Sequence, residues 1–302
     1  MPIIDFHVHT AYYQSMTQSY LDLLRRQWGD GLDQMIRTYS SAKAFLGLMD
    51  ECRVDFAVIL AELAPITTGI ADNEYVAQFC SESSRLLPFA SINPYISSRP
   101  AEELERWVAD RGFRGLKLYP TYQQFYPNDS RIYPLYAKAQ ELGIPVMLHV
   151  GSSVFAGSRL KYGDPIYLDD VAIDFPGLSL IQSHSGRPFW YEKAFALSRL
   201  HKNVYMEVAG LPPQKLLTYF PELERLADKV IFGSDWPGVP TMKENIQAIQ
   251  ALPMGQDAKR MILGGNAARL LGLVGGGKSI SRKARLLLTI HFWEVRKNAS
   301  EG

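Results

Sequence analysis

The sequence predicts an α/β fold of the (β/α)8 TIM barrel class, and three observations support this prediction. Eight short apolar runs, rich in β-branched residues, are bounded by turn residues. Most of the runs are continuously apolar, as expected for parallel strands that are covered on both faces. After the first unit they recur at about 25 to 35 residues, the length of one strand and its helix. Eight such pairs close into a barrel of ordinary size.

Expected strands are followed along the chain by expected helices. Because they are the apolar β-branched runs, the strands are placed at residues 3–9, 54–62, 87–93, 115–119, 145–150, 178–184, 204–208 and 230–235. Helical patterns lie between them, at 41–52, 71–84, 100–111, 132–142, 190–200 and 221–227. A doubly wound open sheet would more often carry a glycine-rich turn after its first strand, and this chain has none there.

Polar residues end the apolar runs, as a barrel with its chemistry at the carboxyl ends of the strands requires. They are His7, His9, Glu62, Asn93, Lys117, His149, His184, Glu207 and Asp235.

Composition restricts the class of protein. The 302 residues carry 32 basic and 31 acidic side chains, with 47% hydrophobic residues, which is typical of a globular protein with a large core. The near-neutral charge gives no reason to expect a nucleic-acid partner.

Two cysteines are too few for a disulfide framework, so buried structural thiols are expected. No signal-peptide pattern and no apolar stretch of about 20 residues is present, which predicts a cytoplasmic protein without a membrane span.

The pattern divides the chain into a barrel over residues 1–274 and a basic C-terminal extension over 275–302. The extension carries a formal charge of +4 and the barrel −3. A basic amphipathic segment can bind an anionic membrane surface, but packing on the barrel exterior, docking of a partner or an extension without function is preferred. Residues 11–40 form an insertion over the active-site face, interpreted as a lid or as a capping helix without a role in specificity.

The strongest chemical signal is the pair His7 and His9 on the first strand. Residues i and i+2 of a strand face the same side, so both imidazoles can share one cation. One histidine on an apolar strand is usually a hydrogen-bonded core residue, but four of the six histidines here end strands. The other two, His201 and His291, are interpreted as non-functional.

This set of residues resembles the amidohydrolase superfamily. The shared features are an N-terminal His-x-His strand, single histidines ending two middle strands, and an aspartate closing the last strand. The chain is more narrowly similar to the amidohydrolase-related branch that includes aminocarboxymuconate semialdehyde decarboxylase and its hydrolase relatives. Segments 49–55, 115–120 and 264–271 are also similar to segments of that branch, and the resemblance covers about residues 3 to 273.

The resemblance implies a divalent metal bound by His7, His9, His149 and Asp235. These ligand types suit zinc, and manganese and iron also accept them. Asp235 would also transfer the proton of a metal-activated water, and His184 would stabilise developing negative charge. Lys117 has two interpretations. When carboxylated it would bridge a second metal ion, as in binuclear members; otherwise it is a charged group beside a single ion.

Substrate binding is predicted at two further positions. Arg187 follows His184 by three residues, where a guanidinium could hold a substrate carboxylate, although a solvent-facing charge is the alternative. Tyr119 has the same strand parity as Lys117 and would line the pocket. The partner is therefore a small-molecule substrate, and because dimers are common in the branch, a homodimer is also an expectation.

The expected function is that of a metal-dependent hydrolase of an amide, ester or lactone bond, acting through metal-activated water. The alternative is a nonoxidative decarboxylase of a small aromatic or enoic acid, which uses the same histidines and aspartate. A non-catalytic, metal-stabilised scaffold is the third hypothesis, and the presence of both Asp235 and His184 weighs against it.

Overall fold

The computed structural model describes residues 1–273, and it confirms the TIM barrel. Eight parallel strands lie side by side in the order β1-β3-β6-β7-β8-β9-β10-β11. They are β1 (Ile4–His9), β3 (Phe56–Leu60), β6 (Leu86–Ser91), β7 (Gly115–Leu118), β8 (Val146–Gly151), β9 (Leu180–Arg187), β10 (Val204–Glu207) and β11 (Val230–Ile231). The predicted extension at 275–302 lies outside the described residues, and the boundary at 274 stays a prediction.

The barrel closes between its first and last strands without a regular ladder. Beyond β11 the chain runs beside β1, where Phe6 N–H donates to Phe232 O and His9 N–H donates to Trp236 O. A parallel bridge joins Val8 to Trp236. The predicted strand at 230–235 is therefore too long: β11 ends at Ile231, and the chain from there to Asp235, whose φ is +68°, contacts β1 through single hydrogen bonds.

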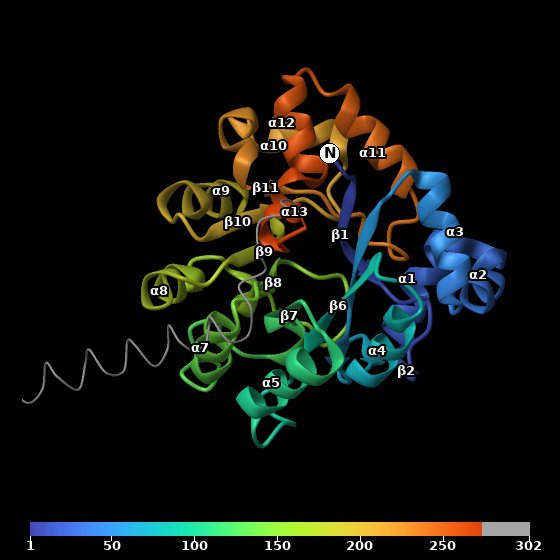
Figure 1. Cartoon of the computed structure of the whole chain (residues 1–302), viewed down its shortest axis with the longest axis horizontal. Helices are drawn as coiled ribbons and strands as arrows, with labels where there is room; N and C mark the ends of the chain where they lie inside the picture. The colour runs from blue at the N-terminus through green and yellow to red at the C-terminus, as the bar shows by residue number, and fades with distance from the viewer. Residues whose placement is uncertain (274–302) are drawn as a thin grey trace, which may run out of the picture. The chain divides into compact units, whose positions relative to one another are not determined.

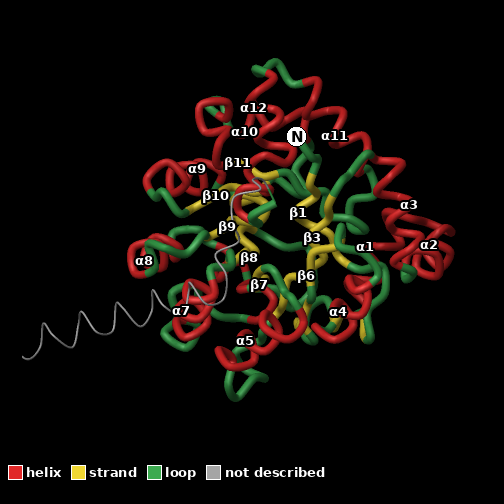
Figure 2. Tube along the Cα trace, in the orientation of Figure 1, coloured by secondary structure: helices red, strands yellow, loops and turns green. Residues whose placement is uncertain are grey.

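Helices surround the strands, as Figures 1 and 2 show. The helices outside the insertion are α3 (Ala42–Cys52), α4 (Asn73–Ser81), α5 (Pro100–Arg111), α6 (Pro120–Gln123), α7 (Tyr133–Leu142), α8 (Tyr167–Asp174), α9 (Tyr191–Leu200), α10 (Leu216–Tyr219), α11 (Met242–Ala251), α12 (Gln256–Arg260) and α13 (Asn266–Leu270). There are also 3₁₀ segments at η2 (Leu160–Gly163), η3 (Pro213–Lys215) and η4 (Leu223–Lys229), and a π segment at η5 (Met261–Gly265). None of the helices within residues 1–273 has the length and apolar content that crossing a membrane requires.

Local sequence explains where several helices begin. The Ser41 and Asp72 side chains accept the N–H groups of Ala44 and Tyr75, which are otherwise unpaired in the first turn. The predicted helix at 221–227 is instead the 3₁₀ segment η4 (Leu223–Lys229). Its two buried leucines, Leu223 and Leu226, are three residues apart, and this spacing fits the 3₁₀ repeat.

The insertion at 11–40 folds into a helical cover with a small sheet at its base. It contains β2 (Ser15–Met16), α1 (Gln18–Trp28), η1 (Gly29–Gly31) and α2 (Leu32–Tyr39). Strand β2 pairs antiparallel with β5 (Gly69–Ala71), which pairs with β4 (Glu62–Ala64). Gly69 makes this pairing feasible, because a Cβ there would meet the Ser15 carbonyl oxygen and its φ is +132°. The insertion is thus attached to the chain that follows β3.

The barrel interior is filled with side chains rather than open. Phe6 and Phe89 lie edge to face with ring centroids 5.4 Å apart, and neither is exposed to solvent. Gly115 on β7 leaves room for the Phe89 ring, since a Cβ there would overlap it. This packing makes the strands a rigid support for the side chains at their carboxyl ends.

Candidate active site

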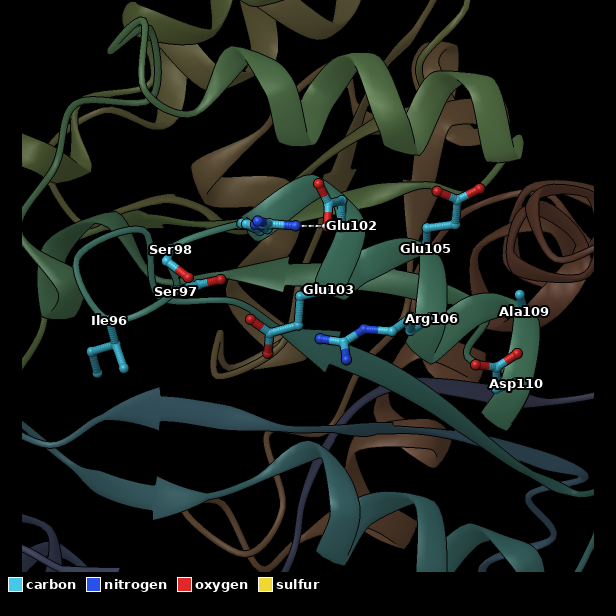
Figure 3. Close-up of a pocket in the computed structure, with 10 residues that line it drawn as sticks. Ile96, Ser97, Ser98, Glu102, Glu103, Glu105, Arg106, Ala109 and Asp110 are labelled. Carbon is cyan, nitrogen blue, oxygen red and sulfur yellow. Dashed lines mark hydrogen bonds and ion pairs between the residues drawn. The ribbon is translucent and has the colours of Figure 1, made fainter.

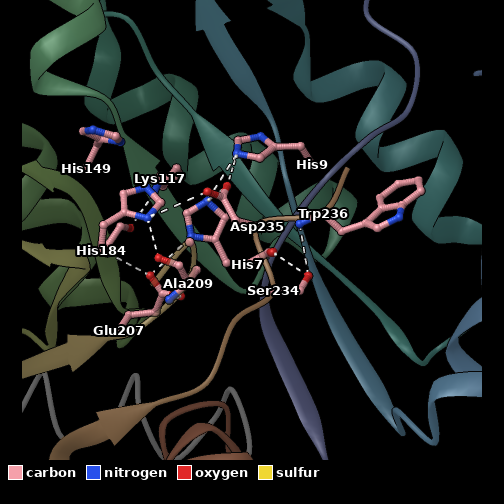
Figure 4. Close-up of polar contacts among 12 residues, drawn as sticks. His7, His9, Lys117, His149, His184, Glu207, Ala209, Ser234, Asp235 and Trp236 are labelled. Atoms are coloured by element: carbon pink, nitrogen blue, oxygen red, sulfur yellow. Dashed lines mark hydrogen bonds and ion pairs between the residues drawn. The ribbon is translucent and has the colours of Figure 1, made fainter. Parts of the chain in front are cut away.

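His7, His9 and Asp235 converge at the carboxyl end of β1 (Figure 4). The Nε2 atoms of the two histidines are 3.2 Å apart. Oδ1 of Asp235 lies 3.4 Å from Nε2 of His7 and 3.8 Å from Nε2 of His9. The i, i+2 spacing on β1 therefore does bring both imidazoles to one point, and the loop after β11 adds the carboxylate.

The opposite ring nitrogens of these histidines face two buried glutamates. Nδ1 of His7 lies 3.3 Å from Oε2 of Glu207, and Nδ1 of His9 lies 3.2 Å from Oε2 of Glu62. When each Nδ1 carries the ring hydrogen, it donates to a carboxylate and the Nε2 lone pair points into the cluster. Carboxylates behind the rings therefore favour the tautomer in which Nε2 is free.

The donor atoms of this cluster fit a divalent cation. His7, His9 and Asp235 offer ligand atoms that all lie within 4.8 Å of one another, and His7, His184 and Glu207 form a second such group. In the second group both Glu207 oxygens already accept backbone N–H groups, from Ala209 at 2.8 Å and from His184 at 3.1 Å. The first group, two imidazole nitrogens and one carboxylate oxygen, is the better match to a metal site.

His184 lies against this cluster in a strained backbone conformation. Its ring centroid is 4.9 Å from that of His7, and its Nδ1 lies 2.8 Å from Ala209 O and 4.0 Å from Oδ2 of Asp235. His184, Ser185 and Asp235 all have positive φ values. Residues other than glycine seldom adopt this conformation, and it concentrates at functional sites.

His149 lies on β8, two residues before its end, but is in neither candidate metal group of the described residues. Its ring centroid lies 4.7 Å from that of His184 and 4.7 Å from that of Tyr122. Nε2 of His149 lies 3.3 Å from Ser152 O. The structure thus brings His149 to the pocket wall, while its role as a metal ligand stays a prediction.

Lys117 and Tyr119 occupy different positions around the site. Lys117 is fully buried, and its Nζ donates to the Ser183 hydroxyl and lies 5.2 Å from the centre of the Tyr119 ring. Tyr119 lines the cavity and donates its hydroxyl hydrogen to Ala61 O at 2.8 Å. Tyr119 is therefore a wall residue, and Lys117 is a buried cation near the cluster.

Burial lowers the pKa of three histidines of the site, His7, His149 and His184. It lowers the pKa of His7, and the nearby positive charge of Lys117 lowers it further. The pKa values of His149 and His184 are lowered by the same two causes, burial first and then Lys117 or Arg187. Imidazoles held neutral in this way are in the form that binds metal.

The acidic groups of the site respond to burial and to hydrogen bonding. Burial raises the pKa of Asp235, although the positive charges of His9 and Arg187 oppose it. Burial also raises the pKa of Glu207. For Glu62 burial alone would raise the pKa, but hydrogen bonds from His9, Thr68 and Tyr13 outweigh it and the pKa is lowered. Glu62 is therefore held as a carboxylate.

A cavity of about 390 Å³ opens above these residues. Arg187 lines it and is oriented by a hydrogen bond from Nη1 to Gly210 O of 2.9 Å. Aromatic residues form another part of the wall: Tyr20 from α1, Tyr122 from α6, and Phe155 from the loop after β8. The cavity thus places one guanidinium and several aromatic rings over the His–Asp cluster.

A larger groove of about 760 Å³ lies along the outside of α5 (Figure 3). It is lined by charged side chains of that helix and by the loop before it, and the exposed ion pair between Arg99 of the loop and Glu102 of the helix is among them. None of the predicted site residues lines this groove. The cavity at the strand ends is therefore the candidate active site.

Three residues that support the histidines were not assigned to the site from sequence. Glu62 and Glu207 were predicted only as polar strand ends, and Tyr13 only as an aromatic residue of the insertion that forms an apolar pocket or covers the rim of the barrel. Both glutamates could have been found from the sequence, because each ends a predicted strand that neighbours a strand ending in histidine. Tyr13 had no such signal, because the small sheet that places it could not be foreseen.

Comparisons with known proteins show the family to which the chain belongs. A sequence model described as Amidohydrolase matches residues 4–273, and the chain therefore belongs to the amidohydrolase family. The gamma-resorcylate decarboxylase of Polaromonas sp. is 24% identical over 249 residues, covering 63% of this chain and 75% of the relative. The protein is thus an enzyme of the amidohydrolase-related class with decarboxylases among its relatives.

Solved structures give the same fold. A TIM-barrel protein from Bordetella bronchiseptica has a TM-score of 0.74 and 25% identity, covering 90% of this chain and 99% of its own. A dihydroxybenzoic acid decarboxylase from Polaromonas sp., with bound manganese and the inhibitor 2-nitroresorcinol, has a TM-score of 0.70 and 17% identity. It covers 90% of this chain and 97% of its own.

Proposed function

We propose that the protein is a nonoxidative decarboxylase of a small aromatic acid. The observation that carries this proposal is the position of Arg187, which lines the same cavity as His7, His9 and Asp235. A guanidinium can hold a carboxylate through two parallel hydrogen bonds. An acidic substrate would thus be bound with its carboxylate near the His–Asp cluster, where the bond to be broken must lie.

The relatives also favour decarboxylation over the hydrolysis first expected. The Polaromonas relative is named as a decarboxylase of a resorcylate, and the manganese-containing structure is a decarboxylase of a dihydroxybenzoic acid. The metal motif serves both reactions equally, so it cannot support hydrolysis by itself. The sequence-based alternative, decarboxylation, therefore becomes the main proposal.

The metal proposed for this site is a divalent ion held by His7, His9, His149 and Asp235. When bound, such an ion supplies a Lewis acid that stabilises negative charge on substrate oxygens. Zinc was the expectation from ligand type, but manganese is bound in the Polaromonas structure and accepts the same ligands. We propose a single ion, with Lys117 as a buried positive charge beside it that donates a hydrogen bond to the Ser183 hydroxyl.

The protein's own residues would bind, orient and protonate the substrate. Arg187 holds the carboxylate, while Tyr119, Tyr122 and Phe155 pack against the ring and exclude water from it. Asp235, whose pKa is raised by burial, delivers a proton to the ring carbon, or His184 does so after it has taken up a proton. The electron pair of the broken carbon–carbon bond moves to that carbon, and carbon dioxide leaves. Buried Lys117 contributes positive charge that favours the anionic substrate.

The size of the cavity limits the substrate to a small molecule. About 390 Å³ is near the lower end of typical ligand pockets, which suits one aromatic ring with a carboxylate and a few substituents. Tyr20 of α1 lies edge to face with Phe155, with centroids 5.6 Å apart. The insertion therefore contributes a wall of the pocket, in keeping with the predicted lid.

The test is a substrate screen on purified, metal-loaded protein. Hydroxylated benzoic acids, with and without a hydroxyl next to the carboxylate, are incubated with the manganese- and the zinc-loaded enzyme. Carbon dioxide release and formation of the phenol are followed together. Lactones and amides are tested in parallel, with proton release as the signal. We expect equal amounts of carbon dioxide and phenol from at least one acid, abolished by a chelator and restored by the metal.

Turnover of a lactone or an amide, without carbon dioxide from any acid, would return the assignment to a hydrolase. Activity that persists after complete metal removal would contradict the proposed role of the His–Asp cluster. Cytoplasmic location and a homodimeric assembly remain part of the proposal, and size-exclusion chromatography with light scattering tests the latter.

A further inference from the structure

Glu62 is a buried carboxylate that the proposed reaction does not use. It stands where the chain leaves β3 and enters the hairpin of β4 and β5, and its exposed fraction is 2%. Burying a carboxylate is costly unless hydrogen bonds compensate for lost water. The hydrogen bonds that Glu62 accepts therefore indicate its role.

Three donors surround the two Glu62 oxygens. The Tyr13 hydroxyl donates to Oε2 at 2.6 Å, and the Thr68 hydroxyl donates to Oε1. The third is Nδ1 of His9, 3.2 Å from Oε2. These partners come from three separate segments: β1, the loop that opens the insertion, and the β4–β5 hairpin.

The arrangement determines which nitrogen of His9 carries the ring hydrogen. A carboxylate only accepts hydrogen bonds, and the Tyr13 and Thr68 hydroxyl hydrogens are already directed at it. Nδ1 of His9 therefore faces two acceptors, Oε2 of Glu62 and the Tyr13 oxygen, the latter at 3.2 Å. A hydrogen on Nδ1 satisfies both contacts. Without it, the lone pair of Nδ1 would face the lone pairs of the Glu62 and Tyr13 oxygens. Nε2 is then left unprotonated, facing His7 and Asp235.

The insertion is needed to complete this arrangement. Tyr13 is buried and lies two residues before β2, whose pairing with β5 places it beside Glu62. The same small sheet holds Thr68, one residue before β5. A lid alone would require no such contact with a histidine of the barrel.

We infer that Glu62 is a positioning residue for the metal site, holding His9 in the tautomer and orientation that bind the ion, and that Tyr13 acts through Glu62. This inference rests on the proposed metal site. A carboxylate behind a ligating histidine fixes its ring and increases its basicity, and its loss typically weakens metal binding about 10- to 100-fold.

The test measures manganese affinity rather than activity. Metal-free wild-type protein and the Glu62→Gln variant are titrated with manganese by calorimetry. Glutamine keeps the shape of the side chain but offers one acceptor oxygen to three donors. We expect binding about 10- to 100-fold weaker. The control is Glu74→Gln, which removes an exposed carboxylate on α4 that pairs with Arg111, and its affinity should equal that of the wild type.

Tyr13→Phe and the double variant separate positioning from general support of the fold. Tyr13→Phe should weaken manganese binding several-fold in the wild-type background and leave the affinity of Glu62→Gln unchanged, because both act on one ligand. Equal affinity of Glu62→Gln and wild type would overturn the inference. If Glu62→Gln does not fold, wild-type affinity in Tyr13→Phe overturns it instead. A wild-type protein that binds no divalent metal would instead refute the proposed function.

Discussion

Glu207 on β10 lies behind His7 on β1, with Oε2 of the carboxylate 3.3 Å from Nδ1 of the imidazole. The same oxygen accepts the backbone N–H of His184 at 3.1 Å, and Oε1 accepts that of Ala209 at 2.8 Å. One buried carboxylate therefore connects three strands of the barrel. Glu207 therefore holds both the ring of His7, a proposed metal ligand, and the strained backbone of His184, a proposed acid–base residue.

Replacing Glu207 by glutamine should destabilise the protein. The amide keeps one acceptor oxygen, so its NH₂ group must face at least one of the three N–H donors. A buried donor without a partner costs about 1–3 kcal/mol. We expect the free energy of unfolding of the metal-free protein to fall by that amount, measured by urea denaturation with circular dichroism.

The matched control is Glu222→Gln, which alters an exposed ion pair with Arg225. Such pairs contribute little, so its unfolding free energy should stay within about 0.5 kcal/mol of wild type. A Glu207→Gln variant as stable as this control would show that the three contacts of Glu207 contribute little to stability.

The strands and most helices could be predicted because their signal is local. Buried parallel strands are continuous apolar runs, and α5 was predicted with the bounds observed. Non-local contacts account for the errors. β11 ends at Ile231, and the chain beyond it makes only single contacts with β1, more than two hundred residues away in sequence. No local pattern encodes such a closure.

The part of the site that lies at the strand ends could be predicted from the sequence. The topology alone brings His7, His9, His184 and Asp235 together, since parallel strands end at one rim. The residues behind the histidines were not predictable, because they depend on side-chain direction and on the three-stranded sheet of the insertion. Glu62 illustrates this: its partners Tyr13 and Thr68 lie in segments with no strand signal of their own.

His149 gives a test of the proposed ligand set. In the described residues its nitrogens lie outside both candidate metal groups, although its ring borders His184. If His149 is a ligand, His149→Asn should weaken manganese binding at least about tenfold, as His9→Asn should. Calorimetric titration of the metal-free variants measures this. Wild-type manganese affinity combined with lost turnover would instead make His149 a substrate-binding residue.

The two cysteines should be unreactive in the folded protein. Cys52 and Cys80 are buried, and burial raises the pKa of both thiols, so the reactive thiolate is depleted at pH values where a free cysteine ionises, about 8.5. We expect negligible reaction with a chromogenic disulfide reagent at that pH, and reaction of both thiols after denaturation. Rapid labelling of the native protein would indicate that α3 or α4 opens locally.

Arg187 should distinguish the acid from its decarboxylated product. A hydrogen bond between charged groups contributes about 1.5–3 kcal/mol, so Arg187→Met should weaken binding of an inert benzoic acid analogue about 10- to 100-fold. The corresponding phenol has no carboxylate, and its affinity should be unchanged. The control is Arg159→Met, an exposed arginine in the loop after β8 that does not line the cavity. Equal losses for acid and phenol would mean that Arg187 shapes the pocket rather than binding the carboxylate.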